Sequence, residues 1–529
     1  MRHFRSLLLA SVLALPLGGP AVLAATPDGV LVVAQNIDDI VAIDPAQAYE
    51  FTSGELVTNI YDRLVQYDAL DPSVLAPGLA SEWTEDPAAR TIVFTMREGV
   101  KFHSGNPVRA EDVVFSFGRV VKLNLTPAFI LTQLGWTPEN VGEMVKADGN
   151  KVVVKYEGDF SPAFVMNVLA ARPASIVDEA VVMANETNGD MGNAWMNAHS
   201  AGSGPFSLQD YRPAELVRLT AFPDYFKGAP KIDSVIIRHV AESATQQLLL
   251  QQGDVDMAKN LTPDQIAGLP ADTIKVEVFP QAAVHFLSFN QKVEALQPEA
   301  VWEAARYLVD YKGMTDTILN GQMETHQAFW PKGFPGSLDE TPFAYDPAKA
   351  KQILADAGVT TPISVTLDVI NSAPFTDMAQ SLQASFAEAG INFEILPGSG
   401  SQVFTKYRER SHEAMLLYWG PDFMDPHSNA KAFAYNSNNA DDAYAATTTW
   451  RNAWAVPEEM NAETLAALSE PDPDKRLAMY VDLQKQVQAK SPIVIMFQAA
   501  YQVAMHKDVT GYVNGATSDF VYYRLVEKG

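Results

Sequence analysis

Apolar and polar residues follow two alternating patterns along the chain. Continuous or alternating apolar runs are typical of β-strands, and apolar residues that recur every three or four positions are typical of amphipathic helices. Strands are predicted at residues 31–34, 65–67, 91–96, 364–370, 391–395, 416–419 and 492–497, and helices at 55–64, 110–121, 375–389 and 473–488. Because strand, helix and strand follow one another between 364 and 395 with short connections, this part predicts a β-α-β unit within an α/β fold.

The predicted strand that ends at Trp419 runs into a turn with two acidic residues. Gly420 and Pro421 break the apolar run, and Asp422 and Asp425 follow. A carboxylate beside aromatic rings at a strand end is suited to holding an ammonium group, because partial desolvation strengthens the charge-assisted hydrogen bond. The alternative is a surface turn whose aspartates only accept hydrogen bonds from backbone N–H groups.

A second candidate contact lies in the loop before the first predicted helix. Tyr49, Glu50 and Phe51 place two aromatic rings beside an acidic side chain there. An ordinary lead-in to a helix explains these residues equally well. On local grounds both interpretations stay open.

The first residues have the pattern of a cleavable secretory signal. A basic start is followed by an apolar run from Leu7 to Leu17 and by small residues up to Ala25. We expect cleavage after Ala24, and therefore a signal peptide at residues 1–24. No later stretch has the roughly 18 to 20 uninterrupted apolar residues that a membrane span needs.

Composition and charge narrow the possible partners. The 529 residues include no cysteine, which excludes disulfides, thiolate metal sites and the anchoring cysteine of a bacterial lipoprotein. Lysine and arginine number 38 against 64 aspartate and glutamate residues, a formal net charge of −26. Such a charge opposes binding to nucleic acids and to anionic membrane surfaces.

The sequence lacks the common motifs of hydrolases and nucleotide-binding enzymes. It has no His-Glu-x-x-His, no phosphate-binding glycine loop and no Gly-x-Ser-x-Gly. Ser203 lies between two glycines without the spacing of a nucleophile, and the nine histidines do not fall at the close spacing of a metal site. We therefore predict no catalytic residue, cofactor or metal, with a secreted hydrolase or other enzyme as the alternative.

One long segment carries a resemblance to a known family. Residues 91–117 read TIVFTMREGVKFHSGNPVRAEDVVFSF, which closely resembles the signature of extracytoplasmic solute-binding proteins of the peptide and nickel class, family 5. Further segments match the family in the same order, namely a glycine turn at 201–206, residues 251–256, a strand at 286–290 and a helix from 345 to 358. In that helix Asp346 suits the N-cap, Pro347 the first helical position and Gly358 the end.

The resemblance implies a periplasmic-binding-protein fold in which two lobes close on a cleft, with an additional small domain of the three-domain, cluster-C-like type. Lobe I is then expected to comprise residues 25–65, 195–283 and 485–529. The small domain is expected at 66–194 and lobe II at 284–484.

The same resemblance implies a set of ligand-binding residues. In peptide-binding relatives the acid of a Trp-x-x-Asp motif holds the α-amino group, and here these positions are Trp419 and Asp422. The amino-terminal loop and the cleft strand line the ligand in such relatives. The predicted ligand-binding set is therefore Asp422, Trp419, Tyr49, Glu50, Phe51, Phe286, Ser288, Asn290, Ser203 and Asp425.

Two departures from the family limit this transfer. Dipeptide-binding relatives hold the ligand's carboxylate with an arginine near the start of the helix predicted at Phe375, where this chain has residues 371–374 without an arginine. Residues 397–402 also lack the aromatic pocket wall that relatives often carry upstream of the tryptophan. Both argue against a tightly clamped dipeptide, and a longer peptide, an amino-bearing small molecule or a sugar-linked ligand fits at least as well.

The function implied is that of a periplasmic solute-binding component of an ABC importer. It is expected to capture a peptide or a related amino-bearing solute as a monomer and to present it to permease subunits in the inner membrane, without binding nucleic acid. Besides an enzyme, the alternative is a binding protein for a metal complex, an opine or an oligosaccharide that serves sensing or chaperone roles.

Overall fold

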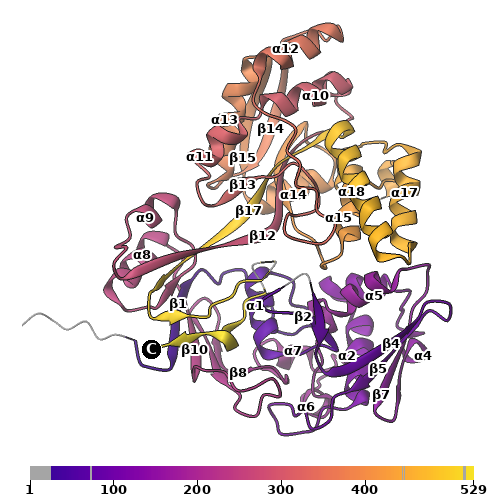
Figure 1. Ribbon diagram of the computed structural model, residues 1–529, viewed down its shortest axis with the longest axis vertical. Helices are drawn as coiled ribbons and strands as arrows, with labels where there is room; N and C mark the ends of the chain where they lie inside the picture. The colour runs from indigo at the N-terminus through magenta and orange to yellow at the C-terminus, as the bar shows by residue number, and fades with distance from the viewer. Residues whose placement is uncertain (1–25, 72–73, 444, 446, 516, 518–519) are drawn as a thin grey trace, which may run out of the picture.

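The computed structural model describes residues 26–71, 74–443, 445, 447–515, 517 and 520–529. The predicted signal peptide, residues 1–24, lies outside the described residues. Figure 1 shows two bodies joined by a pair of long strands. We call residues 26–273 with 507–529 the lower body, and residues 290–492 the upper body.

The largest sheet runs through both bodies. Its strands follow the order β15 (Ile391–Gly398), β14 (Ile363–Ile370), β16 (Ala414–Trp419), β12 (Ile274–Phe289), β17 (Ile493–His506), β11 (Met257–Ala258), β1 (Val30–Gln35), β10 (Ser234–His239), β9 (Leu216–Ala221) and β8 (Phe206–Arg212), and β13 (Met323–Thr325) also pairs with β17. The strands β14 and β15 are parallel and are connected by the helix α13 (Phe375–Ala387), which confirms the predicted β-α-β unit.

The strands β12 and β17 cross from the lower to the upper body (Figure 1). They pair antiparallel from Ile274 opposite His506 to Ser288 opposite Ile493, and the register is interrupted between Pro280 and Val284. Proline cannot donate a ladder hydrogen bond, so it is suited to such an irregularity. The two crossing strands therefore connect the bodies covalently, and their pairing is irregular where they cross.

A second sheet lies wholly in the lower body. It has the antiparallel order β4 (Ala80–Asp86), β5 (Thr91–Met96), β7 (Lys151–Lys155) and β6 (Val145–Asp148). The helix α2 (Ala110–Leu123) buries Val113, Phe117 and Val120, as its predicted apolar face requires, and the Phe117 ring stacks on Trp136 at 5.7 Å between centroids.

The first helix differs from its prediction. Helix α1 spans Phe51–Ile60, so the prediction of 55–64 was wrong by four residues at each end. The chain becomes extended at Tyr61, with φ −123° and ψ 152°. Phe51, expected in a loop, is instead the first helical residue.

Other local predictions hold. Helix α12 (Pro347–Asp356) is capped by Asp346, whose carboxylate accepts a 3.0 Å hydrogen bond from the Lys349 N–H, and Gly358 takes φ +68° just after its end. The helix α18 (Pro473–Lys490) is confirmed, and the strand predicted at 492–497 continues to His506.

The remaining elements connect and cover these sheets. They are β2 (Val65–Tyr67), β3 (Leu75–Pro77), α3 (Phe129–Thr132), α4 (Val141–Met144), α5 (Pro162–Leu169), α6 (Glu179–Ala184), α7 (Asn193–Met196), α8 (Ser243–Gln252), α9 (Pro263–Ala267), α10 (Glu299–Leu308), α11 (Tyr311–Asp316), α14 (Gly400–Arg408), α15 (Pro426–Phe433), α16 (Thr448–Arg451), α17 (Glu458–Ser469), β18 (Val509–Thr510) and β19 (Glu527–Lys528). In the part of the chain that the structure describes, no single helix is long and apolar enough to cross a membrane; α2 and the following helical turn, bent by 114°, would pass only as a pair.

One hydrophobic cluster extends across both bodies. Phe164 on α5 of the lower body contacts Phe423 of the upper body at 5.4 Å and His427 at 5.7 Å between ring centroids, in both cases edge to face. The backbone also joins them, because the Ser161 N–H donates to the Leu468 carbonyl at 3.0 Å. The bodies are therefore packed together, which is the arrangement of a closed two-lobed protein.

Candidate ligand-binding site

Two predicted site residues meet between the bodies. Tyr49, just before α1, donates its hydroxyl to the Asp422 carboxylate at 2.8 Å, and Asp422 lies in the turn after β16. Burial raises the pKa of Asp422, while the Tyr49 hydrogen bond and the charge of Arg172 oppose that rise. Burial and the neighbouring carboxylate also raise the pKa of Tyr49. The result is a desolvated carboxylate held by a neutral hydroxyl.

Two arginines surround this contact. Arg172 donates to the backbone carbonyls of Tyr49 and Glu50, both at 3.3 Å. The guanidinium of Arg451 lies over the rings of Tyr407 and Trp419, at 5.3 and 5.8 Å from their centroids. Sequence reasoning missed both arginines, because neither belongs to a motif and they come from segments far from the Trp-x-x-Asp turn.

Trp419 ends strand β16 with an unused polar atom. Its indole ring meets Phe433 edge to face at 6.3 Å, and its Nε1 is buried without a hydrogen-bond partner among the described residues. A buried indole N–H usually finds an acceptor. A ligand carbonyl or carboxylate beside Asp422 is suited to supply that acceptor.

A cavity of about 240 Å³ opens between the bodies. Most of its surface is apolar, and it lies next to the Asp422 turn because Met424 to Pro426 form part of its wall. Trp330 is also in this wall. The lower body contributes Tyr67, Leu75, Ala163 and Asn167, and the upper body contributes Trp330, Phe334, Pro335, Met424, Asp425, Pro426, Pro473, Arg476 and Leu477.

Asp425 lies at the cavity, but its carboxylate is already occupied. It accepts hydrogen bonds from Arg476 at 2.6 and 2.9 Å and from the His427 N–H at 2.9 Å, which caps α15. Asn167 of the lower body donates to it at 3.3 Å. In this conformation Asp425 therefore holds the protein together rather than presenting a free charge.

The other predicted residues lie apart from the Asp422 carboxylate. Phe286 is fully buried and packs edge to face on Phe433 at 5.6 Å. Asn290 donates to the carbonyls of Arg410 and His412 at 3.0 and 2.8 Å, and Ser288 beside it is buried as well. Their side chains contact the protein interior rather than the cavity.

Ser203, Glu50 and Phe51 have distinct surroundings. Ser203 is buried and donates to Asp62 at 3.0 Å, so it is a turn serine inside the lower body. Glu50 is half-buried beside Tyr49, whose backbone N–H donates to it at 3.3 Å. Phe51 is 45% exposed on the first turn of α1.

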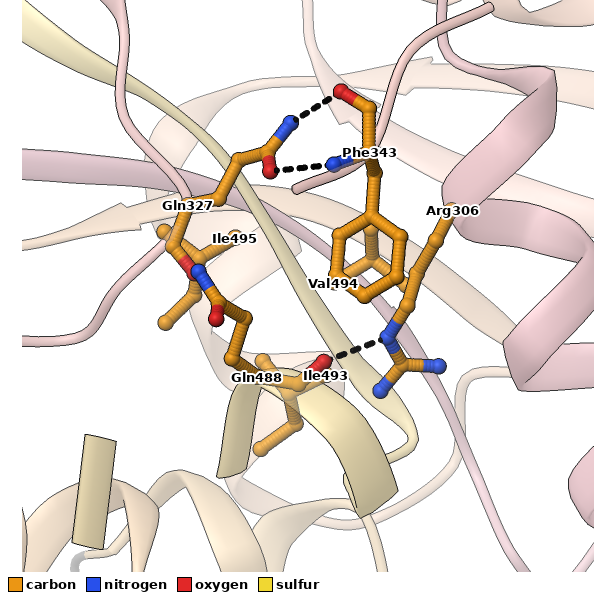
Figure 2. Close-up of a pocket in the computed structure, with 7 residues that line it drawn as sticks. All are labelled: Arg306, Gln327, Phe343, Gln488, Ile493, Val494 and Ile495. Carbon is orange, nitrogen blue, oxygen red and sulfur yellow. Dashed lines mark hydrogen bonds between the residues drawn. The ribbon is translucent and has the colours of Figure 1, made fainter. Parts of the chain in front are cut away.

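A smaller pocket inside the upper body is lined by a buried arginine, Arg306, whose N–H groups donate to backbone carbonyls (Figure 2). Its volume of about 10 Å³ has room for about one water molecule. Arg306 donates to the carbonyls of Gln488, Trp302 and Ser491 at 2.7, 2.6 and 2.5 Å, and burial lowers its pKa to about 10. Gln327 and Phe343 exchange two hydrogen bonds beside it. This pocket is packed interior and not a ligand site.

Within the described residues, no group of three or more histidine, aspartate or glutamate side chains is placed to hold a metal ion. The Nδ1 of His427, beside the cavity, lies at 3.1 Å from the Tyr480 hydroxyl, and burial lowers the pKa of this histidine to about 3. It is therefore a neutral core residue. The polar groups gathered at the Tyr49–Asp422 contact are these two side chains and the nearby arginines.

Comparisons with known proteins agree on one family. The model of bacterial extracellular solute-binding proteins, family 5, matches residues 74–441. The chain is 28% identical over 517 residues, 96% of each chain, to the probable D,D-dipeptide-binding periplasmic protein DdpA of Escherichia coli. It is 25% identical to the dipeptide-binding protein of the same organism, over 88% of this chain and 89% of that one.

Solved structures show the same fold. The substrate-binding protein CtaP of an ABC transporter from Listeria monocytogenes superposes with a TM-score of 0.79 at 19% identity, covering 95% of this chain and 100% of that one. The periplasmic binding protein DppA from Helicobacter pylori, in complex with the peptide STSA, has a TM-score of 0.76 at 22% identity, with 95% and 98% covered.

Proposed function

Because the chain belongs to the bacterial extracellular solute-binding proteins of family 5, we propose that it is the periplasmic binding component of an ABC importer and that its ligand is a peptide. The relatives named above are binding proteins, two of them named for dipeptides, which supports binding and delivery rather than catalysis. The ligand is proposed to lie between the two bodies and to stabilise their closed arrangement.

The observation that carries this proposal is the Tyr49–Asp422 hydrogen bond between the bodies. Asp422 is half-buried, and a carboxylate whose partner is a neutral hydroxyl has acceptor capacity left for a charged donor. The α-amino group of a peptide is such a donor. Its positive charge would compensate the carboxylate for the hydration that it loses on burial. Trp419 would then stack on the ligand and donate its unused N–H to a ligand oxygen.

The adjacent cavity suits a ligand side chain. Asp422 is separated by one residue from Met424, which begins the cavity wall, and consecutive residues span at most about 3.6 Å each. A group bound at Asp422 can therefore extend into the cavity of about 240 Å³. Its largely apolar wall would accept varied side chains, while backbone-directed contacts supply affinity.

The proposal also covers the export, the assembly and the domains of the protein. The protein is proposed to be exported by the signal peptide at residues 1–24, to carry no lipid anchor, to act as a monomer and to dock on permease subunits of the inner membrane. The division into lobe I, a small domain at 66–194 and lobe II is supported by the β4-β5-β7-β6 sheet, which lies entirely between residues 80 and 155.

Native mass spectrometry of the mature protein, purified without denaturation, tests the ligand class. A series of bound masses that match short peptides, absent from an Asp422→Asn variant prepared in parallel, is the expected result. A single non-peptide mass in the wild type would overturn the peptide assignment. It would leave the binding fold in place and direct the search to an amino-bearing small molecule.

A further inference from the structure

Four polar side chains in the cavity wall bind one another in a single chain that crosses from the lower to the upper body. The Tyr67 hydroxyl donates to the Asn167 Oδ1 at 2.8 Å, and the Asn167 Nδ2 donates to the Asp425 carboxylate at 3.3 Å. Arg476 donates to the same carboxylate at 2.6 and 2.9 Å. Among the described residues, none of these four has a buried polar atom without a hydrogen-bond partner. The polar part of the wall is therefore occupied by its own members.

The Asp425 carboxylate has no acceptor site left. Its Oδ1 accepts from Arg476 and from the His427 N–H, and its Oδ2 accepts from Arg476 and from Asn167. A carboxylate has about four lone-pair sites, so these hydrogen bonds use all of them. A hydroxyl or ammonium group that entered the cavity would therefore find no free acceptor on Asp425.

The two charges of the wall also cancel. Arg476 and Asp425 are the charged residues that line the cavity, they are 3% and 0% exposed, and they pair in direct contact. Although burial opposes the charge of Arg476, the Asp425 carboxylate and the Tyr480 hydroxyl raise the pKa of this arginine above its ordinary value. A further charge inserted by a ligand would lose its hydration without gaining a counter-ion.

The rest of the wall is apolar and comes from both bodies. The apolar lining residues are Leu75, Ala163, Trp330, Phe334, Pro335, Met424, Pro426, Pro473 and Leu477. Even the indole N–H of Trp330 is used, because it donates to the Pro335 carbonyl at 3.0 Å. The unbranched side chain of Met424 can adapt its shape to a neighbouring group. A group in the cavity would thus contact carbon atoms of both bodies at once.

The cavity is large enough for a bulky side chain. Its volume is about 240 Å³, whereas an apolar cavity of about 150 Å³ stays dry and binds benzene. A phenyl, indole or isobutyl group therefore fits. Its burial against the apolar wall would be favourable, because apolar surface is removed from water.

The turn after β16 fixes the distance between the cavity and the Asp422 carboxylate. The Asp422 N–H donates to the Ser428 hydroxyl oxygen at 2.9 Å, and Asp425 caps α15 within the same turn. The Cα atoms of Asp422 and Met424 are two residues apart, so they lie at most about 7 Å from each other. A ligand whose amino group binds Asp422 can therefore reach the cavity with its first or second side chain.

We propose that this cavity determines the specificity of the protein, and that it selects peptides with a large, wholly apolar side chain at the first or second residue. The inference rests on the proposed peptide-binding function and narrows it. Leucine, phenylalanine and similar side chains contact carbon atoms of both bodies, so they favour the closed arrangement. Lysine, glutamate and tyrosine bring polar groups to a wall whose hydrogen bonds and charges are already paired, and they are disfavoured.

Calorimetric titration of the wild-type protein, freed of bound ligand, tests this selection without a variant. The probes are tri-alanine and tripeptides in which phenylalanine, lysine or glutamate replaces the first or the second alanine. We expect at least one phenylalanine peptide to bind about tenfold more tightly than tri-alanine, and no lysine or glutamate peptide to exceed tri-alanine. Equal affinity of all probes, or tightest binding of a charged one, would overturn the inference and leave the proposed function standing. Binding of none would overturn both.

The second test fills the cavity from the lower body. Ala163 is an exposed residue of α5 in the cavity wall, so Ala163→Phe should fold, which thermal unfolding checks, and its ring should occupy the space. We expect this variant to lose the preference for phenylalanine peptides over tri-alanine. The matched control Ala355→Phe changes an exposed alanine of α12 outside the cavity wall and should keep the preference. A folded Ala163→Phe variant that keeps the preference would overturn the inference.

Discussion

The Tyr49 hydroxyl donates a 2.8 Å hydrogen bond to the carboxylate of Asp422, a residue 373 positions further along the chain. One partner belongs to the lower body and the other to the upper body, so this bond exists only when the bodies are together. It also places a neutral donor on a desolvated carboxylate. We propose that a charged donor of the ligand binds at this same pair.

Asp422→Asn should weaken binding of an amino-bearing peptide by about 2 to 5 kcal/mol, because the desolvated charge pair is lost while the side-chain shape is kept. Isothermal titration calorimetry measures the change. Tyr49→Phe is the matched control and should cost only about 1 kcal/mol, since it removes one neutral donor. Unchanged affinity in Asp422→Asn would remove this residue from the site.

Arg476→Met should destabilise the protein by about 3 to 5 kcal/mol, because it leaves the Asp425 carboxylate buried without its charge partner. Urea unfolding measures the loss. Lys312→Met breaks the exposed pair with Asp316 and should change stability by no more than about 0.5 kcal/mol. Similar losses in the two variants would contradict the importance of burial here.

Gly202→Ala should lower stability by about 1 to 3 kcal/mol through overpacking. A Cβ atom at this position would lie 2.0 Å from the carbonyl oxygen of Ile60, and backbone cannot move aside cheaply. Gly118→Ala is the control within helix α2, where an added Cβ meets nothing within 4 Å. It should raise stability by about 0.5 to 1 kcal/mol. Thermal unfolding distinguishes the two signs.

Stability should fall as pH decreases from about 6.5 to about 4. Burial lowers the pKa of His285 and His412 to about 4 and that of His427 to about 3, so over this range the unfolded chain binds three protons that the folded protein does not. Burial raises the pKa of Asp62 to about 6, so below that value the folded protein binds one proton that the unfolded chain does not.

Among these four groups the net excess below pH 6 is two protons in the unfolded chain, and each is worth about 1.4 kcal/mol per pH unit. The free energy of unfolding should therefore fall by up to about 3 kcal/mol per unit between pH 6 and pH 4. Urea titrations at several pH values measure the slope. His427→Gln should reduce this slope by the contribution of one proton, about 1.4 kcal/mol per pH unit. A slope unaffected by that change would contradict the lowered pKa of His427.

Helices and strands were predictable where the local sequence pattern favours the same secondary structure that the folded protein adopts. The β14-α13-β15 unit followed from apolar periodicity, and helix α12 followed from Asp346, Pro347 and Gly358. Helix α1 was placed four residues late, because its start at Phe51 has no side-chain cap hydrogen bond to mark it. The family was recognisable from residues 91–117, because a long segment with many constraints is specific.

The sequence by itself therefore determined the fold class, the secretory pattern, the acidic character and the Trp419 to Asp422 turn, since these depend on composition and on neighbours along the chain. Only the tertiary structure decided which side chains meet. It placed Tyr49 on Asp422, occupied Asp425 with Arg476 and turned Asn290 into the interior. These outcomes depend on how β12 and β17 bring distant segments together. Burial sets the strength of the interactions between charges, and a side chain becomes buried only once that packing is complete.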